Sequence, residues 1–128
     1  MKRQNISSGT KWEGIVGYSR VVRIGNIVEV AGTTAMEGDK LLGEGNAYEQ
    51  TKFILLKIET ALKQAGGSMK DVVRTRMYVT DISKWAEVGK AHGEFFKDVK
   101  PVTTMVEVKA LIDPRMLVEM EVSAIIIT

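Results

Sequence analysis

Cysteine is absent from the 128 residues, and histidine occurs once, as His92. The absence of cysteine excludes disulfides, thiolate metal ligands and cysteine nucleophiles. A single histidine excludes a multi-histidine metal site within one chain, because such sites need two or three imidazoles. The sequence therefore predicts a protein with no metal site.

Long apolar runs are also missing, and the N-terminal stretch MKRQNISSGTKW has no apolar segment of the signal-peptide type. The charge is nearly balanced, at +2, and the basic clusters at residues 1–3 and 74–76 are small. A nucleic-acid binder usually carries a basic stripe. We therefore expect a cytoplasmic protein with neither a membrane nor a nucleic acid as its partner.

What the sequence does contain is an ordinary globular composition, 45% hydrophobic and 27% charged. A chain of this length most simply forms one domain with its own core, so we expect a single domain over residues 1–128. Residues 1–13 are polar and rich in Ser, Gly and Lys, and we expect an irregular N-terminal arm there.

The first half of the chain predicts a β-hairpin followed by a loop. Residues 20–24 and 27–31 alternate around Gly25-Asn26, a pair that accommodates positive φ at little cost. The next segment, MEGDKLLGEG, is rich in turn-forming residues and is typical of a loop.

Two amphipathic helices are expected after it. Asn46 precedes apolar residues of helical period and Glu49 follows three residues later, a pattern typical of a capping box. Gly66-Gly67 ends this helix. The second helix, KWAEVGKAHGEFFKDV, is expected to begin after a cap at Ser83.

Three further segments alternate with a period of two and predict strands, which completes the order β-β-α-β-α-β-β: DVVRTRMYVTDI, PVTTMVEV and LVEMEVSAIIIT. Two helices are too few to cover both faces of the sheet, so we expect both on one face. The bare face would carry a mixed apolar and charged set: Arg74, Arg76, Tyr78, Thr103, Met105, Glu107, Glu119 and Glu121. Burial of this face against other copies of the chain would explain its composition, so we infer a homo-oligomer.

Four segments, in this order, resemble the RidA/YjgF family of reactive-intermediate deaminases: GYSRVVRIGNIVEVAGTT, YEQTKFILLKIETALKQAGGSMKDVVRTRMYVTDI, FFKDVKPVTTMVEV and MLVEMEVSAI. The resemblance spans the chain from about Tyr18 to its C-terminal end. It implies a chorismate-mutase-like α+β fold with both helices on one face of a mixed sheet. It also implies a homotrimer with a central barrel of sheets and small-molecule clefts between subunits.

The resemblance further implies an activity. In the family's best-known branch, the clefts hydrolyse enamine or imine intermediates such as 2-aminoacrylate to a 2-keto acid and ammonia, without a cofactor. The implied ligand is therefore a small carboxylate or keto-acid-like metabolite.

One substrate-binding residue of that branch is missing here. In the family, the matching strand begins Pro-Ala-Arg, and the arginine binds the substrate carboxylate. In this sequence Thr103 stands at the position of the arginine. A neutral hydrogen bond contributes about 1 kcal/mol net and a charged one about 1.5–3 kcal/mol. The sequence is thus similar to an arginine-less branch, and Arg74 or Arg76 is a candidate for a substitute anchor.

The resemblance and the side-chain chemistry together nominate the site residues. Glu121 falls where the family has a glutamate that helps to position a water, and His92 titrates near neutrality, so both are expected to be catalytic. Alternatively, Glu121 pairs with Arg74 or Arg76, and His92 only lies at a surface. Substrate-binding residues are expected at Tyr18, Gly32, Thr33, Thr103 and Met105.

Three functions stay open at this point. The first is hydrolytic deamination of a small imine or enamine. The second is a trimeric metabolite-binding module, non-catalytic or of different specificity, that has lost the carboxylate clamp. The third, a ribonuclease or translation inhibitor, is disfavoured by the near-neutral charge and the scarcity of aromatic residues.

Overall fold

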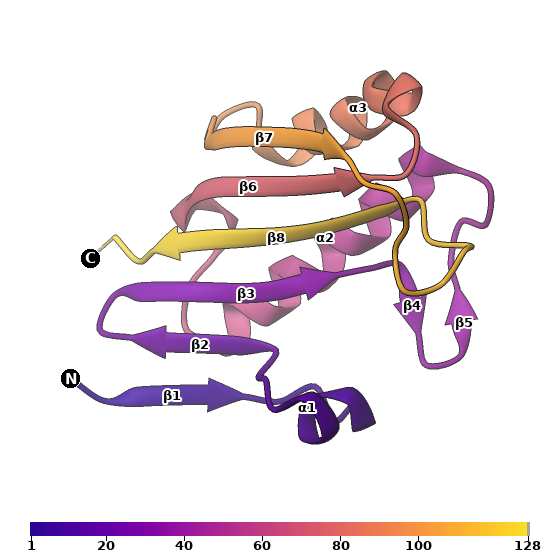
Figure 1. Ribbon diagram of the computed structural model, residues 1–128. Helices are drawn as coiled ribbons and strands as arrows, with labels where there is room; N and C mark the ends of the chain where they lie inside the picture. Colours follow the sequence, from indigo (N-terminus) through magenta and orange to yellow (C-terminus); the bar gives the residue numbers. More distant parts are fainter. Residues whose placement is uncertain (128) are drawn as a thin grey trace.

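The computed structural model describes residues 1–127 and is built around one mixed six-stranded sheet (Figure 1). The strand order is β1-β2-β3-β8-β6-β7; β6 and β7 run parallel, and the other neighbours are antiparallel. The strands span Arg3–Ile6 (β1), Val21–Ile24 (β2), Ile27–Thr33 (β3), Val72–Val79 (β6), Val102–Glu107 (β7) and Val118–Ile125 (β8).

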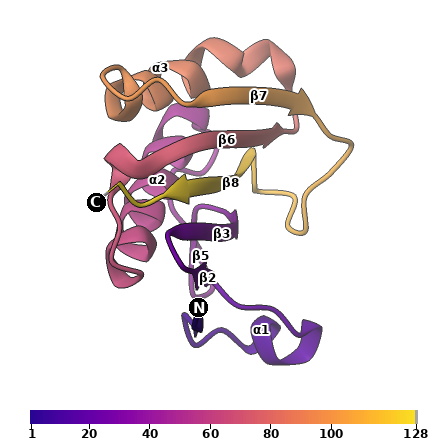
Figure 2. The same ribbon diagram turned by 90° about the vertical axis from the view of Figure 1, so that its left-hand side faces the viewer.

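Helices α2 (Ala47–Gln64) and α3 (Trp85–Phe96) lie on one face of this sheet, as Figure 2 shows. The short helix α1 (Lys11–Val16) lies apart from them, beside β1 and β2. The main core cluster fills the space between the sheet and the two long helices, with Val28, Ile54 and Met120 fully buried. The predicted α+β fold with two helices on one face of a mixed sheet is confirmed. None of the helices in residues 1–127 is both long enough and apolar enough to cross a membrane.

The predicted hairpin and first helix are also confirmed. Gly25 has φ 60° between β2 and β3, the left-handed conformation that glycine adopts without a Cβ clash. At the start of α2, the Glu49 backbone N–H donates to Asn46 Oδ1 at 3.0 Å, so Asn46 is the N-cap. Gly66, at φ 86°, follows the last turn.

Residues 1–13 are not an irregular arm, so that expectation is wrong. Strand β1 forms the edge of the sheet and pairs with β2, so its backbone groups are hydrogen-bonded although its side chains are polar. On α1, the buried Glu13 carboxylate accepts hydrogen bonds from the Ser8 hydroxyl, the Ser8 backbone N–H and the Thr10 hydroxyl. These hydrogen bonds outweigh burial and lower the pKa of Glu13 to about 2.

Two smaller expectations also need correction. The segment expected as a loop contains a short hairpin, β4 (Met36–Glu37) and β5 (Lys40–Leu41), because Gly38 takes φ 62° between them. Ser83 does not cap α3. It lies in a 3-10 turn, Ile82–Lys84, which Asp81 caps by accepting from the Ser83 N–H through Oδ1, and α3 begins after Lys84 without a side-chain cap.

The faces of β6 depart from simple alternation at its first residues. A register irregularity between Val72 and Arg74 buries Val72 and leaves Val73 42% exposed, the reverse of the expected order. From Arg74 onward the alternation holds, and Thr75 and Met77 face the core. A β-bulge has this effect because it inserts one residue into the pleat.

The face assigned to β7 is wrong. In the parallel register, Thr103 lies beside Thr75 and Met105 beside Met77. Side-by-side residues on neighbouring strands point to the same face, so Thr103 and Met105 point to the helix-covered side. The open face carries Val102, Thr104 and Val106 instead. Periodicity shows that residues alternate, but only the pairing partner decides which set faces inward.

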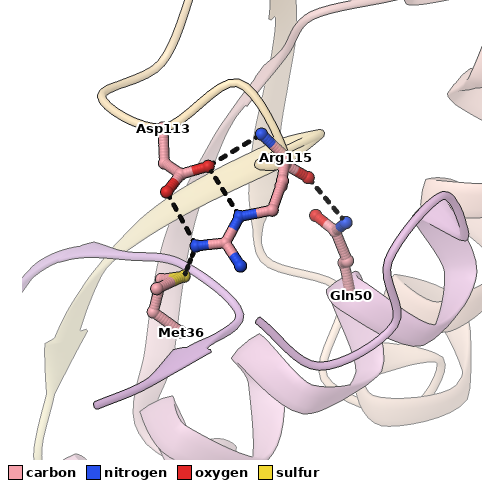
Figure 3. Close-up of polar contacts among 4 residues, drawn as sticks. All are labelled: Met36, Gln50, Asp113 and Arg115. Atoms are coloured by element: carbon pink, nitrogen blue, oxygen red, sulfur yellow. Dashed lines mark hydrogen bonds and ion pairs between the residues drawn. The ribbon is translucent and has the colours of Figure 1, made fainter. Parts of the chain in front are cut away.

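A buried amide joins α2 to the segment that leads into β8 (Figure 3). Gln50 is fully buried, and its Nε2 donates to the carbonyls of Gly43 and Arg115, each at 3.1 Å. Its Oε1 accepts from the Leu117 N–H at 2.8 Å. The Arg115 guanidinium in turn binds both Asp113 oxygens and lowers the pKa of that carboxyl to about 2. The start of β8 is therefore held in place from α2.

We expect Gln50→Leu to lower the free energy of unfolding by about 2–4 kcal/mol, because each unsatisfied buried backbone group costs about 1–3 kcal/mol. Urea unfolding at a fixed protein concentration measures this loss. Gln64→Leu is the matched control, since Gln64 lies exposed on the same helix and should change the value by less than about 0.5 kcal/mol. Equal losses in the two variants would contradict the role given to Gln50.

Candidate functional site

Two candidate residues, His92 and Thr103, meet at a buried hydroxyl. Thr75 Oγ1 lies 2.9 Å from His92 Nε2 and 2.8 Å from Thr103 Oγ1. Thr75 is fully buried on β6, Thr103 is exposed on the edge strand β7, and His92 is half-buried on α3. Sequence reasoning missed Thr75, because a threonine in a strand gives no sign that its hydroxyl links two other side chains.

A hollow of about 320 Å³ opens beside this cluster. It lies where the end of α3 turns into β7, and it is lined by His92, Gly93, Phe96, Lys97, Lys100, Pro101 and Thr103. Burial lowers the pKa of His92, so the imidazole is neutral at pH 7. Lys97 and Lys100 are the two charged residues among those that line the hollow, so a small anion there would meet positive rather than negative charge.

A second polar cluster lies at the end of β3. The Glu119 carboxylate sits directly over Gly32: a Cβ on Gly32 would be 2.1 Å from Glu119 Oε2. The Arg20 guanidinium donates to the Gly32 carbonyl at 2.9 Å and to Thr33 Oγ1 at 3.0 Å. A larger residue at position 32 would push the carboxylate out of this position.

Burial raises the pKa of Glu119; the positive charge of Arg20 opposes this effect, and the negative charge of Glu121 adds to it. Within residues 1–127, the Glu119 carboxylate forms neither a hydrogen bond nor an ion pair. A half-buried carboxylate with a raised pKa and an unused hydrogen-bonding capacity is suited to general acid–base work.

Glu121 has a different environment. The Tyr78 hydroxyl donates to its Oε1 at 2.6 Å, and Arg76 lies 3.8 Å from its Oε2. The hydrogen bond to this carboxylate raises the pKa of Tyr78. Both Glu121 oxygens therefore have partners, in line with the alternative that Glu121 pairs with Arg74 or Arg76. The structure does not bring Glu121 to His92 and Thr103: β8 directs it to the open face.

The remaining candidates are dispersed. Tyr18 follows α1 and is 37% exposed. Thr33 is buried, and its hydroxyl donates to the Ala31 carbonyl at 2.8 Å. Met105 packs partly buried against the core. Of the possible anchors, Arg76 is turned to Glu121, on the face opposite Thr103.

Comparisons with known proteins agree on the family. The profile of the family described as Endoribonuclease L-PSP matches residues 9–126. The crystal structure of Rv2704 from Mycobacterium tuberculosis, a member of the YjgF/YER057c/UK114 family, is 53% identical, covers 98% of this chain and 100% of that one, and superposes with a TM-score of 0.87. The chain belongs to the YjgF/RidA family.

Relatives in the YjgF/RidA family carry related names. A RutC family protein of Pyrococcus abyssi is 34% identical over 84% of both chains. The 3-aminoacrylate deaminase RutC of Acinetobacter baylyi is 30% identical over 80% of this chain and 81% of its own. Family membership was therefore predictable from the ordered segments.

Glu119 is the residue that the sequence could not single out. It lies two positions before Glu121 on the same strand face, so periodicity treats the two alike. Only the approach of β8 to Gly32 separates them, and that approach follows from the pairing of β3 with β8.

We expect Glu119→Gln to increase the free energy of unfolding at pH 7. The pKa of Glu119 is raised above 4.5 in the folded chain, so the folded state holds the proton more tightly than the unfolded one. Well below pH 4.5 Glu119 is protonated in both states and does not destabilise the fold. As the pH rises through the pKa of Glu119 in the folded protein, its negative charge lowers the free energy of unfolding. Urea unfolding at pH 4 and pH 7 should show that the advantage of the variant grows with pH.

Glu121→Gln is the control for this measurement. It weakens the hydrogen bond from Tyr78 and removes the ion pair with Arg76, so it should not stabilise the protein at pH 7. A loss of stability at pH 7 in Glu119→Gln as large as in Glu121→Gln would mean that Glu119 is paired.

Proposed function

We propose that this protein is a deaminase that hydrolyses small imines or enamines carrying a carboxylate, such as 2-aminoacrylate, to a 2-keto acid and ammonia. The observation that carries the proposal is the unpaired, half-buried Glu119 carboxylate over Gly32. The name of its RutC relative, 3-aminoacrylate deaminase, supports the same class of chemistry, because 3-aminoacrylate is also an enamine.

Glu119 would act on water. The enamine tautomerises to the imine, and water adds to the C=N carbon while the carboxylate accepts one of its protons and passes it to the nitrogen, which gives the carbinolamine. The carboxylate then takes the hydroxyl proton and transfers it to the amino group as the C–N bond breaks, so that ammonia leaves and the oxygen stays as the keto group. A positioned carboxylate contributes about 10²–10⁴-fold to such a step. No redox change occurs, so these residues need no cofactor for it.

The substrate carboxylate would bind in the hollow near Thr103, where Lys97 and Lys100 supply positive charge. Glu119 and Thr103 point to opposite faces of one sheet, so one chain cannot present both to the same ligand. We therefore propose that the site lies between two subunits of a homotrimer. The open face supports such an assembly, since Ile27, Val102 and Ile125 on it are 54%, 57% and 47% exposed.

Enzymatically generated 2-aminoacrylate, trapped with semicarbazide, tests the activity. The parent protein should suppress semicarbazone formation, and Glu119→Gln should reduce its kcat/KM by about 10²–10⁴-fold, since the amide cannot accept a proton. Glu121→Gln discriminates between the two carboxylates: if it abolishes hydrolysis and Glu119→Gln does not, Glu121 is the base.

The alternative is a trimeric module that binds a metabolite without this hydrolysis, and Thr103 favours it because it offers a neutral hydroxyl at the arginine position of the deaminase branch. Thr103→Arg separates the two. If the variant gains imine hydrolysis that the parent lacks, the scaffold is competent and the parent has another ligand. An active parent excludes the alternative.

Light scattering tests the assembly, and we expect a mass about three times that of the 14.2-kDa chain. Val106→Glu should lower that mass, because Val106 lies on the open face next to Tyr78. Leu56→Glu is the matched control: Leu56 is 46% exposed, close to the 42% of Val106, but lies on α2. A monomeric parent at neutral pH would overturn the inter-subunit site.

A further inference from the structure

Thr103, Thr75 and His92 form a chain of polar atoms that leads from the hollow into the sheet. The central atom, Thr75 Oγ1, is fully buried and lies within 3 Å of both neighbours, at 2.8 and 2.9 Å. Thr103 Oγ1 lines the hollow, with the Pro101 carbonyl at 3.3 Å as another acceptor for its proton.

The number of protons limits this chain to two arrangements, because each hydroxyl donates one hydrogen bond. If His92 Nε2 is unprotonated, it accepts from Thr75, which in turn accepts from Thr103; Thr103 then presents only lone pairs to the hollow. If Nε2 carries a proton, it donates to Thr75 and Thr75 donates to Thr103. The Thr103 proton is then available to a ligand.

Few charged groups face His92. Lys97 from the end of α3 and Lys100 from the following turn share its hollow. From β6 and β7 it meets the hydroxyls of Thr75 and Thr103. Glu94 on α3 accepts instead from the Tyr48 hydroxyl of α2, at 2.7 Å. A proton on His92 can therefore act on the hollow by two routes, directly from the ring that lines it and through the Thr75 hydroxyl, and only the second route needs Thr75.

We propose that Thr75 links His92 to Thr103 as a proton-controlled switch, so that the hollow binds a small carboxylate together with a proton on His92 Nε2. This inference rests on the proposed function for the nature of the ligand, a small carboxylate. Thr75 is a positioning residue in this switch, because it is fully buried, lies outside the lining of the hollow and sets the direction of the Thr103 hydroxyl; His92, which lines the hollow, holds the proton.

The sign of the linkage follows from reciprocity between two bound species. A carboxylate favours the arrangement in which Thr103 donates outward and Nε2 carries a proton. With the neutral imidazole protonated on Nδ1, this arrangement requires the imidazolium, so carboxylate binding raises the pKa of His92. Protonation of His92 in turn tightens carboxylate binding by the same factor. Burial lowers the pKa of the free His92 below 6.5, so affinity should rise as the pH falls from 8 to 5.

His92 is the sole histidine, so its ring gives one set of NMR signals in the full-length protein. The probe is pyruvate, and the background is Glu119→Gln, so that protonation of Glu119 does not contribute. We expect saturating pyruvate to move the imidazole nitrogen shifts toward the Nε2-protonated form and to raise the pKa of His92. Pyruvate should bind at least about fivefold more tightly at pH 5 than at pH 8.

Thr75→Val removes the linking hydroxyl at nearly constant volume, and it should reduce the ratio of the two affinities well below that of the parent background, because only the direct effect of the His92 charge remains. Thr75→Ser keeps the hydroxyl and should retain the ratio. Thr103→Val, at an exposed position, breaks the chain at its outer end and serves if Thr75→Val does not fold. Pyruvate that fails to bind, a ratio near one in the parent background, or the same ratio in the hydroxyl-free variants overturns the switch.

The outcome is independent of the deaminase assay. If pyruvate binding is linked to His92 and 2-aminoacrylate hydrolysis is absent, the switch stands and the proposed reaction falls. If hydrolysis is present and the linkage is not, only the switch is wrong.

Discussion

Thr75 and Thr103 lie side by side because β7 joins the sheet edge parallel to β6, in a register that pairs these two residues. The pairing turns the Thr103 hydroxyl toward the helix side, where α3 brings His92 to the same buried oxygen. A shift of one residue would direct Thr104 and Val102 to that side instead and leave Thr75 without its partner hydroxyl. The hydroxyl–imidazole cluster and the rim of the hollow therefore both depend on the backbone hydrogen bonds that pair β7 with β6.

Strand β8 imposes the complementary constraint on the carboxylates. Its apolar residues Val118, Met120 and Val122 are buried under the helices, so Glu119 and Glu121 must share the opposite face. On that face the two differ only in their neighbours. Glu121 meets Tyr78 and Arg76 across β6, whereas Glu119 reaches toward β3, where Gly32 gives it room. A carboxylate on one face and a hydroxyl cluster on the other form one site only if a second copy contributes.

Much of the fold could be predicted from the sequence because apolar periodicity and caps are local signals: the β2–β3 hairpin, α2 and the faces of β8 are examples. Pairing was not predictable. The inward face of β7, the bulge near Val73 and the strand β1 all depend on which neighbour a segment meets. The same limit applied to the site. His92 and Thr103 could be nominated from chemistry and resemblance, but Thr75 and Glu119 acquire a role only through neighbours distant in sequence.

A hydroxyl at position 103 differs in kind from the guanidinium that the resemblance to the deaminase branch leads one to expect there. Arginine supplies a permanent positive charge and donors of fixed direction in one side chain. A threonine hydroxyl is neutral and rotates, so neighbouring residues must supply the charge and fix the direction of its proton. Here Lys97 and Lys100 supply the charge. Lys100 does so at φ 55°, with its N–H donating to the Phe96 carbonyl at 2.8 Å, a position after a helix that glycine occupies without strain. A left-handed conformation costs a residue with a Cβ about 1–2 kcal/mol, so this lysine places a charged side chain beside the hollow at a backbone cost that glycine would avoid.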